Sequence, residues 1–142
     1  MGKIIVIAGK GGTGKTTLAS LLIDGLSKNK KGSILAVDAD PNSNLAEFLG
    51  LSQNESIGGI LEEICKNPDL LPKNMSKDEY IDYRIQTALS ESNGFDLIAM
   101  GRPEGPGCYC FVNNVLRNIV DRLIKKYDYI VVDNEAGLEH LS

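Results

Sequence analysis

Short apolar runs alternate along the chain with segments in which apolar residues recur at helical spacing. The runs cover residues 4–8, 33–38, 95–100 and 127–133. Their length and β-branched composition are typical of buried strands. We expect the first run to form the central strand of a parallel sheet, because its apolar residues are consecutive rather than alternating.

Helical segments lie between these runs. Apolar stripes predict helices at residues 15–28, 45–49, 57–66 and 111–124. A further helix should begin at Ser76, which can form a capping box with Glu79. Strands separated by helices predict an α/β fold, a mainly parallel sheet with helices on both faces and ligands at the carboxyl ends of the strands.

The size and composition suit one globular domain. The chain has 142 residues, of which 42% are hydrophobic and 24% charged. After Asp133 it contains only what resembles the first turn of another helix. We therefore expect residues 1–142 to be the N-terminal part of one longer domain, truncated at its C-terminus, with weak or no catalytic turnover when isolated.

The charge balance argues against two classes of partner. A net charge of -4 and a pI of about 5.0 provide no basic field for nucleic acid or an anionic membrane. The first apolar run is too short for a signal sequence or a membrane span. We expect a cytoplasmic protein with no nucleic-acid or membrane partner.

A glycine-rich segment, "GKGGTGKTT", lies between the first predicted strand and the first predicted helix. This is the context of a P-loop, whose backbone N–H groups surround a phosphate at a helix N-terminus. The predicted nucleotide-binding residues are Gly11, Gly12, Thr13, Gly14, Lys15, Thr16 and Thr17. The loop would hold ATP or ADP. Lys15 would reach the β- and γ-phosphates of ATP, Thr16 would bind Mg²⁺, and Thr17 would bond the α-phosphate.

Two acidic residues end apolar strands close to this loop. Asp133 fits the acid that holds Mg²⁺ through water, and Asp38 ends another predicted strand. Either residue alone could equally be an ordinary strand-end cap. Together with the loop, they predict a magnesium site made by Thr16, Asp38 and Asp133.

The three cysteines do not suggest a disulfide framework, because their number is odd and the chain looks intracellular. Cys65 stands beside Ile64 in an apolar helical stretch and is expected in the core. Cys108 and Cys110 follow "EGPG" and precede a helix, whose N-terminus favours thiolates. The pair indicates metal or redox chemistry, with two small half-buried side chains as the alternative.

The loop resembles those of the deviant Walker A ATPases, the MinD-like (SIMIBI) family that includes MinD, ParA and nitrogenase iron protein. Lys10 matches that family's signature lysine, which acts across a nucleotide-dependent homodimer; a solvated surface lysine is the alternative. "DADPN" resembles switch I of these ATPases, and the resemblance implies that Asp40 orients the attacking water. "DNEAG" resembles switch II and contains Asp133 and Gly137. The resemblance departs at Asn134 and Glu135. It implies ATP hydrolysis with Lys10, Lys15 and Asp40 as catalytic residues.

The order of "GKGGTGKTT", "DADPN", "GRPEGPGCYC" and "DNEAG" resembles the CooC-type nickel-insertion ATPases. The resemblance implies a cytoplasmic ATP-dependent metallochaperone that delivers nickel to carbon monoxide dehydrogenase. In a two-fold dimer, Cys108 and Cys110 occur twice and supply four thiolates. Four thiolates suit Ni²⁺, Zn²⁺, Cu⁺ or an iron-sulfur cluster, and the ligands alone do not choose among them.

Two other functions fit the same phosphate loop. An iron-sulfur electron carrier similar to nitrogenase iron protein would also be a dimer with a shared four-cysteine site, although such ligands usually come from separated loops. A spatial organiser similar to MinD or ParA would use ATP as a timer, but it would leave Cys108 and Cys110 without a role.

Overall fold

The computed structural model describes residues 2–9, 14–29, 32–39, 45–52, 55–101 and 109–134, with the backbone alone for 109–116. Its elements, in chain order, are β1 (Lys3–Ala8), α1 (Lys15–Lys28), β2 (Ile34–Asp38), α2 (Leu45–Phe48), α3 (Ile57–Lys66), the 3-10 helix η1 (Pro68–Leu70), α4 (Lys77–Ala88), β3 (Ser90–Ser92), β4 (Phe95–Ala99), α5 (Tyr109–Ile124) and β5 (Tyr129–Asn134).

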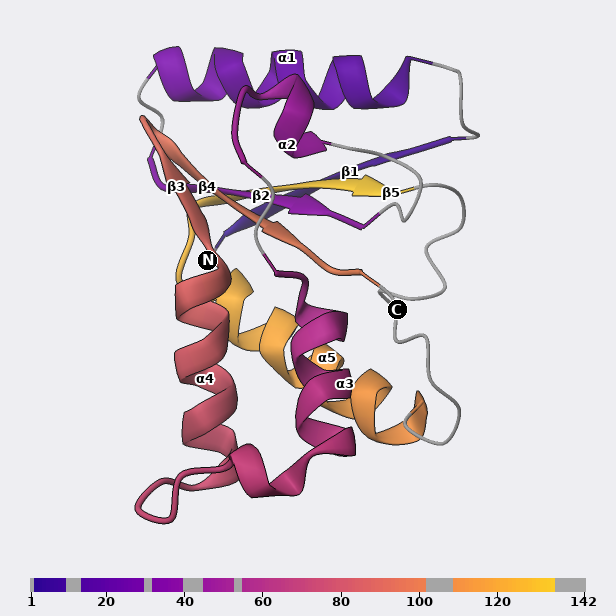
Figure 1. Cartoon of the computed structure of the whole chain (residues 1–142). Helices are drawn as coiled ribbons and strands as arrows, with labels where there is room; N and C mark the ends of the chain where they lie inside the picture. The colour runs from indigo at the N-terminus through magenta and orange to yellow at the C-terminus, as the bar shows by residue number, and fades with distance from the viewer. Residues whose placement is uncertain are drawn as a thin grey trace.

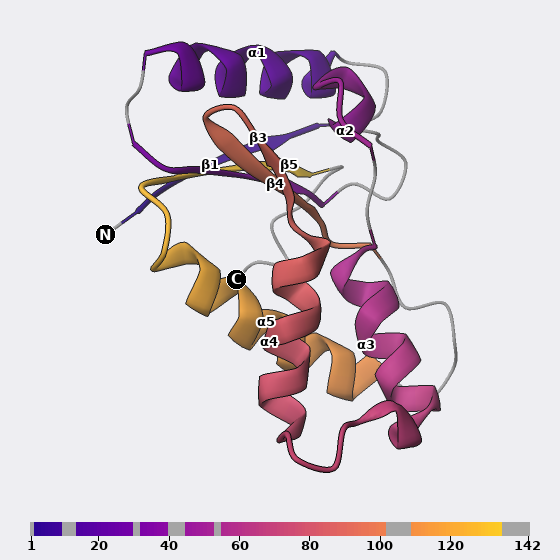
Figure 2. The ribbon, with the colours of Figure 1, turned by 60° about the vertical axis from the view of Figure 1, so that its left-hand side comes forward.

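The described strands form one sheet in the order β1-β5-β2-β4-β3. Strands β1, β5, β2 and β4 run parallel, and β3 pairs with β4 in the antiparallel direction. Helices α1 and α2 cover one face of the sheet, and α3, α4 and α5 cover the other (Figures 1 and 2). The expected α/β architecture with helices on both faces is confirmed.

The expectation that the first strand is central is wrong for the described part of the chain. There β1 pairs only with β5 and forms an edge of the sheet. Ile4, within β1, is 48% exposed. An apolar run predicts that a strand is buried, but it does not predict which strands pair with it or which helices pack on it.

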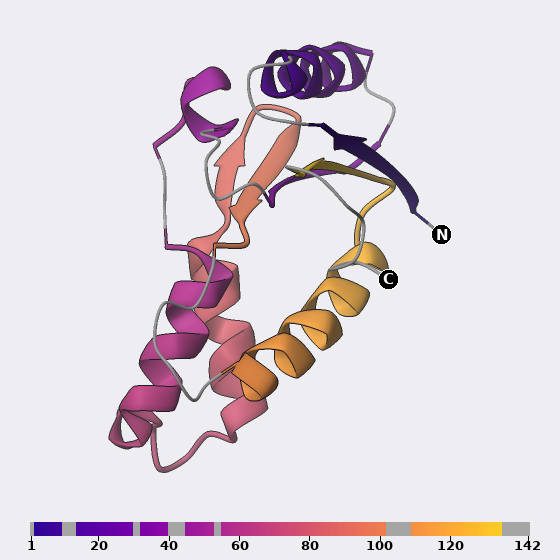
Figure 3. The same ribbon diagram turned by 90° about the vertical axis from the view of Figure 1, so that its right-hand side faces the viewer.

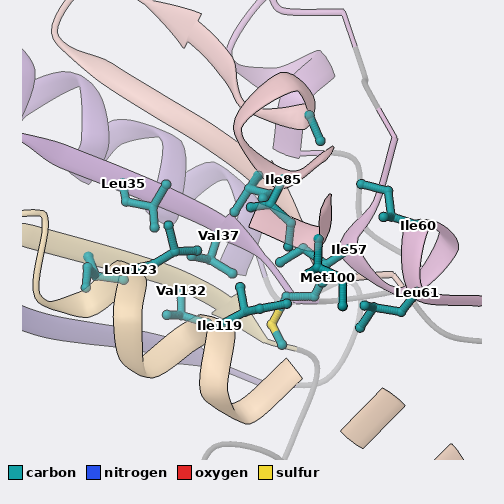
Figure 4. Close-up of a cluster of buried hydrophobic side chains, with 14 of the residues drawn as sticks. Leu35, Val37, Ile57, Ile60, Leu61, Ile85, Met100, Ile119, Leu123 and Val132 are labelled. Atoms are coloured by element: carbon teal, nitrogen blue, oxygen red, sulfur yellow. The ribbon is translucent and has the colours of Figure 1, made fainter. Parts of the chain in front are cut away.

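Each face of the sheet has its own core. The larger cluster lies under α3, α4 and α5, and Figure 4 shows its side chains meeting between these helices and the sheet. The smaller cluster lies under α1 and α2 and includes Ala19, Ile23 and Leu45, all fully buried. Because both faces are packed, the carboxyl ends of the parallel strands are held in fixed positions.

Helix ends follow the sequence signals. Helix α3 ends at Lys66, and Pro68 follows as the first residue of η1. Ser76 caps α4, and its side chain accepts a hydrogen bond from the Glu79 amide at 3.2 Å. No helix among the described residues is long and apolar enough to cross a membrane.

Candidate nucleotide-binding site

Three parallel strands end side by side at the predicted site. In the register of the sheet, Asp133 of β5 lies between Ile7 of β1 and Asp38 of β2. The Ala39 amide also donates to the Asp133 carbonyl at 2.8 Å. The carboxyl ends of the strands therefore bring together two acids that are 95 residues apart in the chain.

Lys15 and Asp133 form a buried ion pair beside these strand ends. Lys15 is the first residue of α1 and is 6% exposed, and Asp133 is fully buried. The distance from Lys15 Nζ to Asp133 Oδ1 is 3.0 Å, and the Thr16 hydroxyl donates to Asp133 Oδ2 at 3.0 Å. The loop residues and the strand-end acid predicted from the sequence thus meet in one place.

The backbone at the start of α1 suits an anion. Gly14 is the N-cap residue with a φ of 80°, in the left-handed region that favours glycine. No side chain caps this helix end. The first N–H groups of a helix have no partner within the helix, so such an end combines backbone donors with the positive end of the helix dipole.

Asp38 contacts the next element along the chain. Its carboxylate Oδ2 accepts a hydrogen bond from the Leu45 amide at the start of α2, at 3.3 Å. Its carbonyl accepts from the Met100 amide at 2.8 Å. The carboxylate of Asp38 therefore links the end of β2 to the start of α2. Its role at a magnesium ion stays a prediction.

The oxygen atoms present fit Mg²⁺, which prefers hard oxygen ligands and keeps several waters. The Thr16 hydroxyl and the Asp133 carboxylate both lie at the start of α1, and together they provide two such ligands. Lys15 is already paired with one oxygen of Asp133. A phosphate bound here would therefore compete with Asp133 for the Lys15 ammonium group.

Several predicted residues lie outside the described part of the chain: Lys10, Gly11, Gly12, Thr13, Asp40, Cys108 and Gly137. Cys110 belongs to the backbone of α5, and its side chain is likewise outside. Thr17 is exposed in the first turn of α1. Among the described side chains, no group of three or more His, Cys, Asp or Glu residues is arranged to hold a metal ion.

Two features of the described chain were missed by the sequence reasoning. Gly101, two residues after the end of β4, has a φ of 64°, and a Cβ there would collide with Ser56, the N-cap of α3. Cys65 packs half-buried against the larger core cluster, as expected, but it is also disulfide-bonded. The sequence reasoning favoured metal binding, catalysis or burial for the cysteines and did not predict this bond. Sequence spacing gives no signal for a bond between distant cysteines.

The AAA domain family model matches residues 1–142. The chain belongs to this family. An uncharacterized ATP-binding protein of Methanocaldococcus jannaschii is 53% identical over 141 residues, which cover 98% of this chain and 55% of that protein. The carbon monoxide dehydrogenase accessory protein CooC of Rhodospirillum rubrum is 26% identical over 147 residues, covering 96% of this chain and 56% of CooC.

A solved structure agrees with the fold of this AAA domain. The septum site-determining protein MinD of Pyrococcus horikoshii, complexed with Mg-ADP, matches with a TM-score of 0.64 and 24% identity, over 99% of this chain and 52% of that protein. The AAA domain described here spans about half the length of the curated relatives it matches. The likeness to this solved structure shows the fold, and the relative at 53% identity is an ATP-binding protein.

Proposed function

We propose that the protein binds ATP with Mg²⁺ and hydrolyses it at the site built around Lys15. The observation that carries this is the contact of Lys15 and Thr16 with the fully buried Asp133. Lys15 exchanges Asp133 for the β- and γ-phosphates, and Thr16 with Asp133 holds the magnesium ion. Bound magnesium neutralises charge on the phosphate oxygens.

We assign the remaining catalytic roles to two loop residues. Asp40 follows Asp38 closely and orients the attacking water. Lys10 stabilises charge on the transferring phosphoryl group of the partner subunit, so that hydrolysis requires a homodimer. Both roles are carried over from the deviant Walker A resemblance.

We further propose that the cargo is nickel and that the recipient is carbon monoxide dehydrogenase. Cys108 and Cys110 of two subunits supply four thiolates, which also suit zinc. The support is the "PEGPGCYC" segment together with similarity to CooC along 96% of the chain. A spatial organiser similar to MinD is the alternative, and it gives the cysteine pair no role.

The nucleotide site is tested with Lys15→Ala in the full protein, and Lys28→Ala is the matched control. Lys28 stands at the other end of α1, where its side chain is 76% exposed and paired with Asp24. We expect Lys15→Ala to weaken ATP binding by about 100-fold, the equivalent of about 3 kcal/mol for one charge-assisted contact. Calorimetry that finds equal affinities for the two variants contradicts the site.

The metal cargo is tested by metal analysis and size-exclusion chromatography of the anaerobic full protein, with and without ATP. Wild type is compared with the Cys108→Ser/Cys110→Ser double variant. We expect an ATP-dependent dimer that holds one nickel ion, and a double variant that binds ATP but loses the metal. Unchanged metal content in the double variant refutes the nickel proposal. Iron with a visible charge-transfer spectrum favours the electron carrier instead.

A further inference from the structure

The charges of the Lys15–Asp133 ion pair cancel each other before any nucleotide is bound. The two side chains meet at 3.0 Å, with Lys15 6% exposed and Asp133 fully buried. The second carboxylate oxygen of Asp133 accepts a hydrogen bond from the Thr16 hydroxyl, also at 3.0 Å. Both oxygens of the carboxylate therefore have a partner. A bound polyphosphate would bring further negative charge to a buried place in which the charges are already balanced.

Asp133 is held in place by its backbone, whereas Lys15 is not. Strand β5 places Asp133 between Ile7 of β1 and Asp38 of β2, and the Asp133 carbonyl accepts from the Ala39 amide at 2.8 Å. Lys15 is the first residue of α1, and its ammonium group lies at the end of a flexible four-carbon stem. Figure 3 looks along α1, which lies over β1, β5 and β2. When the ion pair opens, the lysine side chain moves and the carboxylate stays.

Binding of a phosphate by Lys15 leaves the site short of one positive charge. If Lys15 moves away, Asp133 keeps only the Thr16 hydroxyl, and a buried carboxylate without its cation is costly. If Lys15 stays, a carboxylate and a phosphate share one ammonium group and repel each other, strongly so in a buried place. In both arrangements a second cation removes the deficit. The oxygens of Asp133 and Thr16 suit Mg²⁺ as that cation.

We propose that the Lys15–Asp133 ion pair is a latch that makes the site selective for magnesium-complexed nucleotide over the metal-free form. Without the metal, the ion pair stays closed and withholds Lys15 from the phosphates. With the metal, Asp133 and Thr16 have a new partner, and Lys15 is released to the β-phosphate. This inference deepens the nucleotide site proposed above and rests on it.

The same latch acts on the metal. Coupling between two ligands is reciprocal, so a pair that weakens the binding of nucleotide without magnesium also weakens the binding of magnesium without nucleotide. In the protein without nucleotide, the Lys15 ammonium group occupies the Asp133 oxygen that a cation would approach. The site therefore responds to the two ligands together and only weakly to either alone.

The latch is tested with Asp133→Asn in the full protein, by calorimetry of ADP in excess EDTA and in excess Mg²⁺. We expect metal-free ADP to bind Asp133→Asn at least about tenfold more tightly than wild type, because Lys15 is no longer held in an ion pair. Asp128→Asn is the matched control. Asp128 directly precedes β5 at its other end, where its carboxylate accepts from the Ser33 amide. This control should bind ADP as wild type does under both conditions.

An Asp133 that acts only as a metal ligand would leave the affinity for metal-free ADP unchanged, and that result overturns the latch. Loss of a negative charge would also tighten ADP binding by relief of repulsion alone. The comparison of Lys15→Ala with Lys15→Ala/Asp133→Asn separates the two causes. We expect no gain from Asp133→Asn when Lys15 is absent. A gain of the same factor in that background overturns the latch.

A thermal unfolding measurement decides the question independently of whether Asp133→Asn folds. Wild type and Lys15→Met are compared in magnesium chloride without nucleotide, with potassium chloride of equal ionic strength as the reference. Magnesium should raise the unfolding midpoint of Lys15→Met, in which Asp133 has lost its cation, and not that of wild type. Equal shifts in the two proteins overturn the latch.

The wild-type protein distinguishes failure of the latch from failure of the nucleotide site. We expect wild type to bind ADP with Mg²⁺ at least about tenfold more tightly than ADP in EDTA. Equal affinities overturn the latch and leave the nucleotide site in place. Wild-type protein that binds ADP under neither condition refutes the nucleotide site itself.

Discussion

Asp133 is a fully buried carboxylate whose two oxygens are divided between an ammonium group and a hydroxyl group. Oδ1 accepts from Lys15 and Oδ2 accepts from Thr16, each at 3.0 Å. A buried charge without its partner is costly, and a matched pair offsets that cost by its mutual attraction. The residues assigned to nucleotide binding therefore also contribute to the stability of the fold.

This dual role predicts strong coupling between Lys15 and Asp133. Lys15→Met leaves a buried carboxylate without its ion pair, so the free energy of unfolding should fall by about 3 kcal/mol. Asp133→Asn alone should also destabilise the protein. The double variant should be more stable than the sum of the single effects predicts, by at least about 1 kcal/mol, in urea denaturation. Simple additivity would show that the pair contributes no coupling.

Gly101 gives a second prediction for a single residue. Its φ of 64° and the closeness of Ser56 both disfavour a side chain. Gly101→Ala should lower the free energy of unfolding by about 2 kcal/mol, from left-handed backbone strain and the collision.

The matched control for this substitution is Gly25→Ala, inside α1. A Cβ at Gly25 meets nothing within 4 Å. The helical preference of alanine should stabilise the protein by about 0.5–1 kcal/mol. Chemical denaturation of both variants checks the pair, and a neutral Gly101→Ala would contradict the strained geometry.

Helices α3 and α4 are joined by the side chain of Arg84. Its guanidinium group donates to Glu63 of α3 at 2.8 Å, to Glu55 at 3.1 Å and to the Tyr80 hydroxyl at 3.1 Å. The Glu63 hydrogen bond, more than the others, raises the pKa of Arg84 above its ordinary value. Arg84 therefore stays charged throughout the neutral and mildly alkaline pH range.

The Arg84 contacts should stabilise the protein more than an exposed ion pair does. The Arg84 side chain is 13% exposed, whereas Arg122, which pairs with Asp82 at 2.8 Å, is 44% exposed. Arg84→Gln should lower the free energy of unfolding by about 1–2 kcal/mol, and Arg122→Gln by less than about 0.5 kcal/mol. Thermal unfolding compares the two variants. Equal losses would mean that the Arg84 contacts are as weak as surface pairs.

The success of the sequence predictions differs from element to element for physical reasons. Helix α3 was predicted from its apolar pattern and the Asn67-Pro68 that follows it, and α4 from the capping box of Ser76 and Glu79, because these are local signals. Strand β3, "SES", was missed because three polar residues carry no apolar pattern, and it forms only by pairing with β4. Lys15, Thr16 and Asp133 were predicted to act together, since a phosphate loop and a strand-end acid each have a sequence signature.

At the scale of the whole molecule, contacts between residues that are far apart in the chain were not predicted from the sequence. The edge position of β1 depends on β5, which begins 126 residues after β1 begins. The bond to Cys65 likewise depends on tertiary packing. On the face of the sheet opposite Cys65, Leu18 and Leu21 of α1 are 58% and 63% exposed. An apolar pattern in the sequence identifies the residues that favour burial. Only the tertiary structure shows which neighbouring strand or helix buries them.

The edge position of β1 has a consequence for amide hydrogen exchange. The Lys3 amide donates to the Asp128 carbonyl on the β5 side, at 2.8 Å. In a parallel ladder alternate residues of a strand face the same neighbour. We therefore expect slow exchange at Lys3, Ile5 and Ile7, and fast exchange at Ile4, Val6 and Ala8. Uniform protection along the strand, measured by NMR, would contradict the one-sided pairing.

Because of this alternation, amide exchange in β1 can distinguish a change in the phosphate loop from the pairing of another chain with the outer edge of the strand. The strand leads directly into the segment that contains the phosphate loop, so tighter packing of that loop should slow exchange first at the carboxyl end, around Ile7 and Ala8. Any chain that pairs with the outer edge of β1 should instead slow Ile4, Val6 and Ala8 together. Loop packing and edge pairing would thus give two different patterns of amide exchange over the six residues of β1.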